Sequence, residues 1–179
     1  MSASLRRRED LLSLVPAVVL QALAVVAIDF DRRHDHPAAG RLVLATAVAV
    51  IGSLLANAAL VAIGTTVFPA TKGFVHFEFS DYGRLTVLGV VLACASWPIV
   101  SRISSVPRWV FFRLAVAVTL VLWLPDVWIL IHGEPPDAVL VLMLMHLAVA
   151  LVTYPTLVHV APIRQWSDGL VGRSLPLWI

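Results

Sequence analysis

The chain alternates between long apolar runs and short polar connectors. Each run has roughly 18 to 25 residues, the length that a helix needs to cross the hydrocarbon core of a bilayer. A segment in that environment is helical, because its backbone hydrogen bonds must be satisfied internally. The pattern therefore predicts an all-α fold, a polytopic transmembrane helical bundle with four core spans and a fifth, N-terminal helix. The five runs are Leu11–Ile28, Leu42–Thr66, Tyr82–Ile103, Val110–Ile131 and Ala138–Val160.

The connectors divide the chain into four parts. These are a polar N-terminal segment (1–10), an N-terminal hydrophobic helix with its connector (11–40), a four-helix transmembrane core (41–162) and a cytoplasmic tail (163–179). Two interpretations of residues 11–28 stay open. The first is a fifth span, and the second is an interfacial helix or an uncleaved targeting segment. A span would place Arg6, Arg7 and Arg8 outside, against the positive-inside rule.

The composition is typical of a membrane protein. Hydrophobic residues make up 60% of the chain and charged residues 13%, and the mean hydropathy is +0.92. Soluble domains are about half apolar and about a quarter charged. With 179 residues, we expect one membrane domain and no separate soluble catalytic fold. The formal net charge of +2 is too small to indicate a nucleic-acid partner. The apolar composition indicates that the chain lies in the lipid bilayer.

The charges of the connectors predict the threading of the core, because Lys and Arg are enriched on the cytoplasmic side. Arg41 and the 101–108 turn are basic, whereas the 132–137 turn carries two acidic residues and neither Lys nor Arg. We therefore expect the 101–108 turn and the C-terminus inside, and the 67–81 and 132–137 connectors outside. The expected location is the cytoplasmic (inner) cell membrane, as a multi-pass protein.

The 67–81 connector is rich in aromatic residues. Phenylalanines alternate there with polar residues, in the order Phe74, His76, Phe77, Glu78 and Phe79. Such alternation predicts an extended segment, either an aromatic anchor at the membrane surface or a binding loop. The tryptophans, among them Trp97 and Trp109 beside the basic turn, are typical of interfacial belts.

Small residues recur at intervals of four in the first core span, at Ala45, Ala49, Ser53 and Asn57. This spacing places them on one helical face. A face of small residues lets a second helix approach closely in a membrane. We expect this face to be a packing surface, with the Asn57 amide hydrogen-bonded across it.

A candidate intramembrane polar cluster consists of Asn57, Thr86, Asp126 and His146. Ionisable residues such as Asp126 and His146 are expensive inside a bilayer and mark interior or functional positions. At about 1.5 Å per residue, Asp126 and Thr86 lie roughly 8 Å from the outer ends of their helices, and Asn57 and His146 roughly 13 Å. Two interpretations stay open. The cluster is a buried hydrogen-bond set that fixes helix register, or a small polar cavity, open to the outside, that binds a ligand or relays a proton.

Other chemistry is poorly supported by the sequence. There is no HExxH motif, no glycine-rich phosphate loop and no cysteine pair, since Cys94 is the single cysteine. A haem between helices needs two histidines at matched depth, and His146 is the one deep histidine. His34 and His36 lie in a connector and read as solvated. Four further residues could gather round a metal only if distant outer segments meet: His76, Glu78, His132 and Glu134. We expect no catalytic residue, cofactor or metal.

Several short motifs are spread along the core. They are Leu55-Ala56-Asn57, the Phe-rich outer connector, Thr86-x-x-Gly89, Arg102 and Arg108 of the inner turn, Pro125, and Met145-His146-Leu147. Between Arg41 and Pro162 this pattern resembles a family of small bacterial four-span integral membrane proteins known only as a domain of unknown function. The resemblance implies a membrane location and a four-helix fold, and it implies no activity. The N-terminal run departs from the four spans usual in that family.

The expected function is non-enzymatic, that of a structural or accessory membrane component that packs with other membrane proteins or with a second copy of the chain. The alternative is a small transporter or a lipid- or ligand-binding protein that uses a polar cavity in the outer half of the bundle. A membrane enzyme ranks below both, because no paired catalytic constellation is present. A sealed interior favours the accessory role, and a cavity lined by the polar cluster favours the ligand-binding role.

Overall fold

The computed structural model describes residues 37–104 and 106–163. They form four long helices and two single-turn 3-10 helices, with no strand in this part of the chain: α3 (Ala39–Val67), η1 (Pro69–Thr71), η2 (Val75–Phe77), α4 (Phe79–Ile103), α5 (Pro107–Ile131) and α6 (Pro136–Val160). Each long helix has the length and hydropathy of a membrane span. The predicted polytopic helical bundle with four core spans is confirmed. The predicted N-terminal helix over 11–28 lies outside the described residues.

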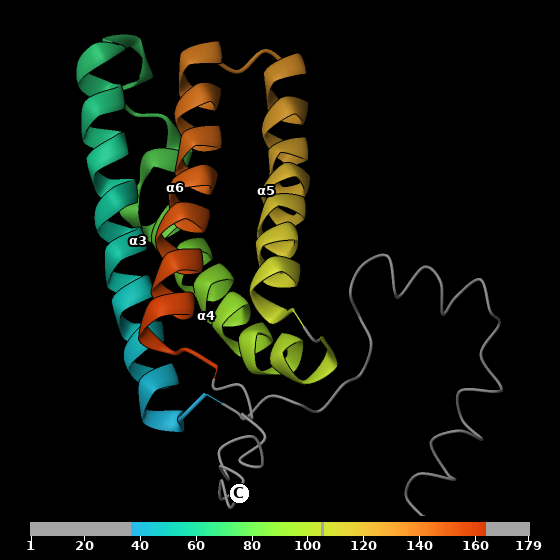
Figure 1. Ribbon diagram of the computed structural model, residues 1–179. Coiled ribbons are helices and arrows are strands. Elements are labelled where there is room, and N and C mark those ends of the chain that lie inside the picture. The colour runs from blue at the N-terminus through green and yellow to red at the C-terminus, as the bar shows by residue number, and fades with distance from the viewer. Residues whose placement is uncertain (1–36, 105, 164–179) are drawn as a thin grey trace, which may run out of the picture.

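Three of the long helices run side by side, and α4 crosses them obliquely (Figure 1). The most extensive contact joins α3 to α6, and α5 packs mainly on α6. A short turn between Ile103 and Pro107 keeps the end of α4 beside the start of α5. Because α4 is oblique, the two helices diverge from that turn toward the opposite end of the bundle.

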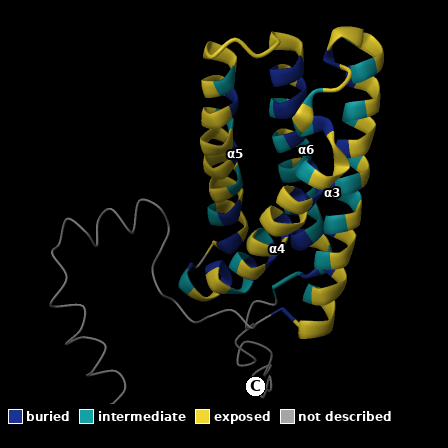
Figure 2. Ribbon diagram, turned by 180° about the vertical axis from the view of Figure 1, so that it is seen from behind, coloured by how far each residue is buried: buried dark blue, intermediate teal, exposed yellow. Residues whose placement is uncertain are grey.

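The outer surfaces of the helices are apolar, as a bilayer requires. Figure 2 shows α5 almost wholly exposed, with buried positions concentrated where α3, α4 and α6 meet. Exposed leucines, valines and isoleucines cover these surfaces, for example Leu55, Leu124 and Leu151 at about two thirds exposed. In water such a surface would aggregate, whereas lipid tails cover it without penalty. The protein is therefore a multi-pass membrane protein.

The helices begin two or three residues before the predicted starts, and in α4, α5 and α6 the reason is local. Pro107 and Pro136 lie at the first positions of α5 and α6, where proline is favoured because the missing N–H has no helical partner there. Asp81 lies in the first turn of α4, where its negative charge favours an earlier helix start. These residues lengthen the spans beyond their most apolar stretches.

The small-residue face of α3 packs against α6, as predicted. Ala45, Ala49, Ser53 and Asn57 are buried, with Gly64 further along the same helix. At Gly64 the backbone of α3 is so close to α6 that an added Cβ would lie 2.8 Å from a methyl carbon of Val141. Small side chains therefore set the distance between these two helices, and packing of side chains is what joins them.

The prediction of an extended segment in the 67–81 connector is wrong. The connector turns twice, at η1 and η2, and α4 begins at Phe79. Its aromatic residues serve packing, because Phe77 is buried beside Tyr82 of α4 and Phe74 meets Phe77 edge to face. The alternating aromatic and polar residues therefore belong to a 3-10 turn, η2, that leads into the start of α4.

The assignment of Trp97 to an interfacial belt is also wrong. Its side chain is fully buried, and its indole N–H donates a hydrogen bond of 2.9 Å to the carbonyl oxygen of Ala161. The ring contacts Phe111, which in turn stacks on Tyr154. Because α4 is oblique (Figure 1), this end of the helix meets α5 and α6, and the tryptophan points inward.

Candidate functional site

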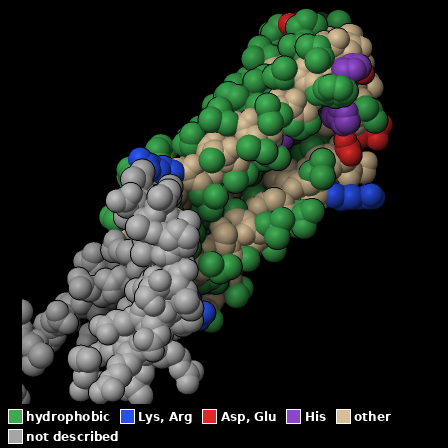
Figure 3. Space-filling view, turned by 90° about the vertical axis from the view of Figure 1, so that its right-hand side faces the viewer, with side chains coloured by type: hydrophobic (Ala, Val, Ile, Leu, Met, Phe, Trp, Pro, Cys, Tyr) green, Lys and Arg blue, Asp and Glu red, His purple; other side chains and the backbone are tan. Residues whose placement is uncertain are grey.

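The two ends of the described bundle differ in charge. One end, here called the arginine end, carries Arg41, Arg102, Arg108 and Arg113. The other, here called the acidic end, carries Glu78, Asp81, Glu134 and Asp137 together with Lys72 and Arg84. Figure 3 shows histidine and acidic side chains gathered toward the acidic end. The four residues of the polar cluster lie in the half of the bundle that belongs to this acidic end.

One pair of the cluster joins α3 to α4. The Asn57 side chain is 2% exposed and its Nδ2 donates a hydrogen bond of 2.9 Å to Thr86 Oγ1. Both residues are buried because each lies on the inner face of its helix. A polar contact between two spans holds their register, with a typical worth of about 0.6 kcal/mol in membranes.

The other pair joins α5 to α6. Asp126 is 5% exposed, and its Oδ2 lies 3.0 Å from Nδ1 of His146, whose side chain is 29% exposed. The two atoms are at ion-pair distance, but their angle does not make a well-formed hydrogen bond. The tight turn between Ile131 and Pro136 places these residues opposite each other. The sequence placed both residues in one candidate cluster, and the structure brings them into direct contact.

A cavity of about 490 Å³ contains all four residues of the cluster. It lies where α4 and α5 diverge, with α6 behind them. Aliphatic side chains form most of its wall, and leucines of α4 and α5 that are exposed to lipid form its rim: Leu85, Leu88, Leu92 and Leu122. The space is therefore a mainly apolar chamber with a polar patch on one wall, and it opens sideways between two helices.

A second histidine–aspartate pair lines the same cavity. His76 of η2 lies with its Nδ1 2.8 Å from Oδ2 of Asp81 in the first turn of α4. Both side chains are more than two fifths exposed, so this pair lies toward the water of the acidic end. Sequence reasoning missed it, because the 3-10 turn that brings the two residues together has no clear periodic signature. Their separation of five residues across a helix start was the available signal.

Several buried polar atoms of the described residues have no hydrogen-bond partner. They are Ser53 Oγ, Asn57 Oδ1, Asp126 Oδ2, His146 Nδ1 and Thr153 Oγ1. Native proteins leave few such groups, and each one indicates an ordered water, a ligand or a functional role. Asn57, Asp126 and His146 also line the cavity. These three residues therefore have buried atoms with incomplete hydrogen bonding beside the cavity.

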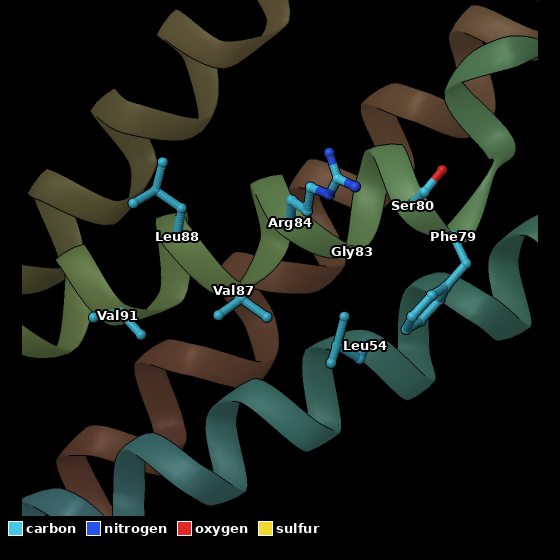
Figure 4. Close-up of a pocket in the computed structure, with 8 residues that line it drawn as sticks. All are labelled: Leu54, Phe79, Ser80, Gly83, Arg84, Val87, Leu88 and Val91. Atoms are coloured by element: carbon cyan, nitrogen blue, oxygen red, sulfur yellow. The ribbon is translucent and has the colours of Figure 1, made fainter.

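A second hollow lies on the lipid side of α3 and α4 and has a different character. Its walls are Leu54, Val87, Val91 and neighbouring residues, with Ser80 and Arg84 as its polar members. Figure 4 shows the Arg84 side chain reaching along α4 toward Ser80, while Val87 and Leu54 face the groove between the helices. The groove is open and shallow, and an acyl chain of the bilayer suffices to fill it.

The outer residues considered for a metal do not come together. His76 pairs with Asp81, and Nδ1 of His132 lies 2.8 Å from the carbonyl oxygen of Trp128 on its own helix. Within residues 37–104 and 106–163 there is no group of three or more side chains with metal-ligand chemistry. The cavity at the Asp126–His146 pair is therefore the candidate functional site.

Comparison with known proteins adds a family and no activity. No curated protein and no solved structure matches the chain. Residues 32–162, well over half of the 179 residues, match a protein family described as a family of unknown function, DUF6069. The matched region contains the four long helices and every residue of the candidate site. The chain therefore belongs to the DUF6069 family of unknown function.

Proposed function

We propose that this protein binds a small lipophilic molecule in the cavity between α4 and α5. One observation carries the proposal: the four polar residues singled out within the spans all line a single cavity. A set that only fixed register would be enclosed among packed side chains. Here all four residues line the cavity, and the His146 side chain is 29% exposed, which supports the ligand-binding alternative over the purely accessory role.

The size and lining of the cavity fit such a ligand. Small-molecule sites are typically about 300–1,000 Å³, with mostly apolar walls and a few polar groups that orient the ligand. This cavity has about 490 Å³ and mainly aliphatic walls. Its rim of lipid-exposed leucines supports entry from the bilayer, with the polar end of the ligand directed to Asp126 and His146.

The opposite half of the bundle supports binding in preference to passage across the membrane. Trp97, Phe111 and Tyr154 form a continuous aromatic contact at the arginine end, and Trp97 is fully buried. A transport route would need this barrier to open. The cavity is therefore closed toward the arginine end of the bundle.

A cavity-filling substitution tests the proposal. Gly89 lines the cavity, and a Cβ added there meets nothing within 4 Å, so Gly89→Leu fills cavity space without replacing a residue of the polar cluster. Gly40→Leu is the matched control, because Gly40 has equally free surroundings at the start of α3. Native mass spectrometry after incubation with a bacterial lipid extract should show a small-molecule adduct on the parent and on Gly40→Leu, reduced on Gly89→Leu. No adduct, or equal adducts on all three, would refute the proposal.

The orientation proposed for the bundle places the cavity in the outer half of the cytoplasmic membrane. The charge difference between the two ends supports it through the positive-inside rule. Ser104 is buried, so Val106→Cys and Gly133→Cys are the suitable labelling sites, both being exposed. In a Cys94→Ala background, an impermeant maleimide should label Gly133→Cys from outside and Val106→Cys only after membrane disruption. The reverse result would invert the threading.

A structural role remains the second candidate, and the Asn57–Thr86 hydrogen bond favours it for that part of the cluster. This bond ties two spans together without needing a ligand. Chemical cross-linking in native membranes tests the accessory role: a defined partner whose capture is unaffected by Gly89→Leu would favour it. The non-enzymatic character of the protein stays a prediction.

A further inference from the structure

We propose that the groove between α3 and α4 binds an anionic phospholipid, with the lipid phosphate on the Arg84 guanidinium and one acyl chain along the apolar wall. The groove has a volume of about 630 Å³ and shares only Leu88 with the lining of the cavity described above, so the inference does not rest on the proposed function. It begins with Arg84, which lies within a membrane span. An arginine there is costly unless a counter-charge or water meets it.

The protein supplies no counter-charge to Arg84 in the part of the chain that the structure describes. The side chain is exposed, and among residues 37–104 and 106–163 it makes neither a hydrogen bond nor an ion pair. The nearest carboxylates along the chain belong to Glu78 and Asp81. Asp81 pairs with His76, Glu78 precedes the first residue of α4, and neither lines the groove. The guanidinium is therefore the one charged group in the described lining.

The polar and apolar residues of the groove are separated along α4. Ser80 and Arg84 are four residues apart, so they share a face near the acidic end, and Figure 4 shows the Arg84 side chain reaching toward Ser80. Val87 and Val91 continue the lining toward the midpoint of α4. From Phe79 to Val91 the helix rises roughly 18 Å, while one leaflet contributes roughly 15 Å of hydrocarbon. The oblique groove thus has the length and the order of polarity of a phospholipid in one leaflet.

The donors at the polar end of the groove fit a phosphate. The planar guanidinium of arginine binds phosphate oxygens through paired N–H bonds and keeps its charge. The hydroxyl of Ser80 is a further donor. The backbone N–H groups of Phe79 and Ser80 at the start of α4 have no backbone acceptor among the described residues, and a helix start favours an anion.

The charge of the lining favours an anionic over a zwitterionic head group. A head group with a single net negative charge balances Arg84. The ammonium of a zwitterionic head group would find no carboxylate in the lining to pair with. The ligand class is therefore an anionic phospholipid such as phosphatidylglycerol, bound in the leaflet on the side of the acidic end.

Photo-crosslinking tests the inference. The protein is reconstituted in phosphatidylcholine vesicles that contain a small fraction of phosphatidylglycerol, or of phosphatidylcholine, with a diazirine in one acyl chain. Peptide mapping should find crosslinks at Leu54, Val87 and Val91, which line the groove. These crosslinks should be about fivefold more abundant with the labelled phosphatidylglycerol, since one basic residue contributes about 1 kcal/mol to binding of anionic lipid and 1.4 kcal/mol is tenfold.

Variants assign the preference to Arg84. Arg84→Gln should abolish the excess of phosphatidylglycerol crosslinks in the groove, whereas Arg84→Lys, which keeps the charge but not the planar fork, should retain part of it. Lys72→Gln is the matched control. It removes the same charge at the same end of the bundle, from an exposed residue outside the lining, and it should leave the excess unchanged. Crosslinks at the arginine end serve as the internal reference in each sample.

Competition on the parent protein serves if Arg84→Gln does not fold. Replacing part of the host lipid by unlabelled phosphatidylglycerol should reduce the groove crosslinks of the labelled phosphatidylglycerol, and zwitterionic phosphatidylethanolamine should not. Equal groove crosslinks from the two labelled lipids would mean that the groove takes acyl chains alone, and this result would overturn the inference. A preference that survives Arg84→Gln, or that Lys72→Gln removes equally, would overturn it as well. None of these results bears on the cavity between α4 and α5.

Discussion

The half of the bundle at the arginine end and the half at the acidic end are built from the same four helices, yet the interval between α4 and α5 is packed in the first and hollow in the second. At the arginine end, Trp97, Leu157 and Phe111 fill the space between α4, α5 and α6. At the acidic end, the same interval between α4 and α5 holds about 490 Å³ of cavity. Composition does not explain the contrast, since both halves are rich in aliphatic residues.

The difference follows from how the helices are joined. The connection between α4 and α5 is short at the arginine end, and large aromatic side chains fill the contact there. At the acidic end α4 is joined to α3 through η1 and η2 and leans away from α5 (Figure 1). An oblique helix that is tied at one end diverges at the other, and the polar residues of the cluster occupy the space that results. A functional site is expected where close packing is incomplete.

The largest effect is expected from the packed half. Trp97→Ala removes a fully buried ring and its hydrogen bond to Ala161, and comparable core truncations cost about 3–5 kcal/mol. Trp128→Ala is the control, because Trp128 is 61% exposed. Unfolding in mixed micelles would measure both. If the two variants lose similar stability, the packed half is not the stabilising half.

Overpacking of the α3–α6 contact should have the next largest effect. Ala49→Leu and Ser53→Leu place large side chains at fully buried positions of α3, with an expected loss of about 1–3 kcal/mol. Val48→Leu is the control, because Val48 faces outward at 45% exposed. Unchanged melting of both buried variants would mean that this face looks at lipid.

Two glycines of the acidic half give a sharper comparison, because Gly64 lies at the close α3–α6 contact and Gly89 lies at the cavity. Gly64→Ala forces a Cβ to 2.8 Å from a Val141 methyl, whereas Gly89→Ala meets nothing within 4 Å. Alanine favours a helix over glycine by up to about 1 kcal/mol, so Gly89→Ala should be neutral or stabilising and Gly64→Ala destabilising. Thermal melting in detergent compares them, and equal shifts would remove the steric distinction between the two sites.

The smallest effect is expected at the polar pair. Asp126→Asn and His146→Gln should each destabilise, because each leaves its buried partner uncompensated, and the double variant should lose less than the sum. Polar couplings in membranes average about 0.6 kcal/mol. A double-mutant cycle in bicelles measures the coupling. Strict additivity would mean that the 3.0 Å contact contributes no coupling to stability.

The sequence predicted the spans, because a long apolar run in the hydrocarbon core must satisfy its backbone hydrogen bonds internally, and a helix does so. It also predicted the small-residue face of α3, since spacing by four defines a helical face. It did not predict the inward turn of Trp97 or the pairing of His76 with Asp81. The second depends on the 3-10 turn η2 just before α4. The first depends on the angle at which α4 crosses the bundle, and hydropathy carries no information about that angle. The cavity depends on the same angle, so the sequence could nominate its polar residues but not the space they share.

One measurement tests the contrast between the halves directly. Gly89→Cys would place a thiol in the cavity, five residues along α4 from the native Cys94, which is 1% exposed in the packed half. In the folded protein, N-ethylmaleimide should modify the cysteine at position 89 at a rate at least tenfold above that of Cys94, and a bound lipophilic molecule should slow that reaction. Equal rates at the two positions, or no reaction at position 89, would contradict a hollow acidic half above a sealed arginine half.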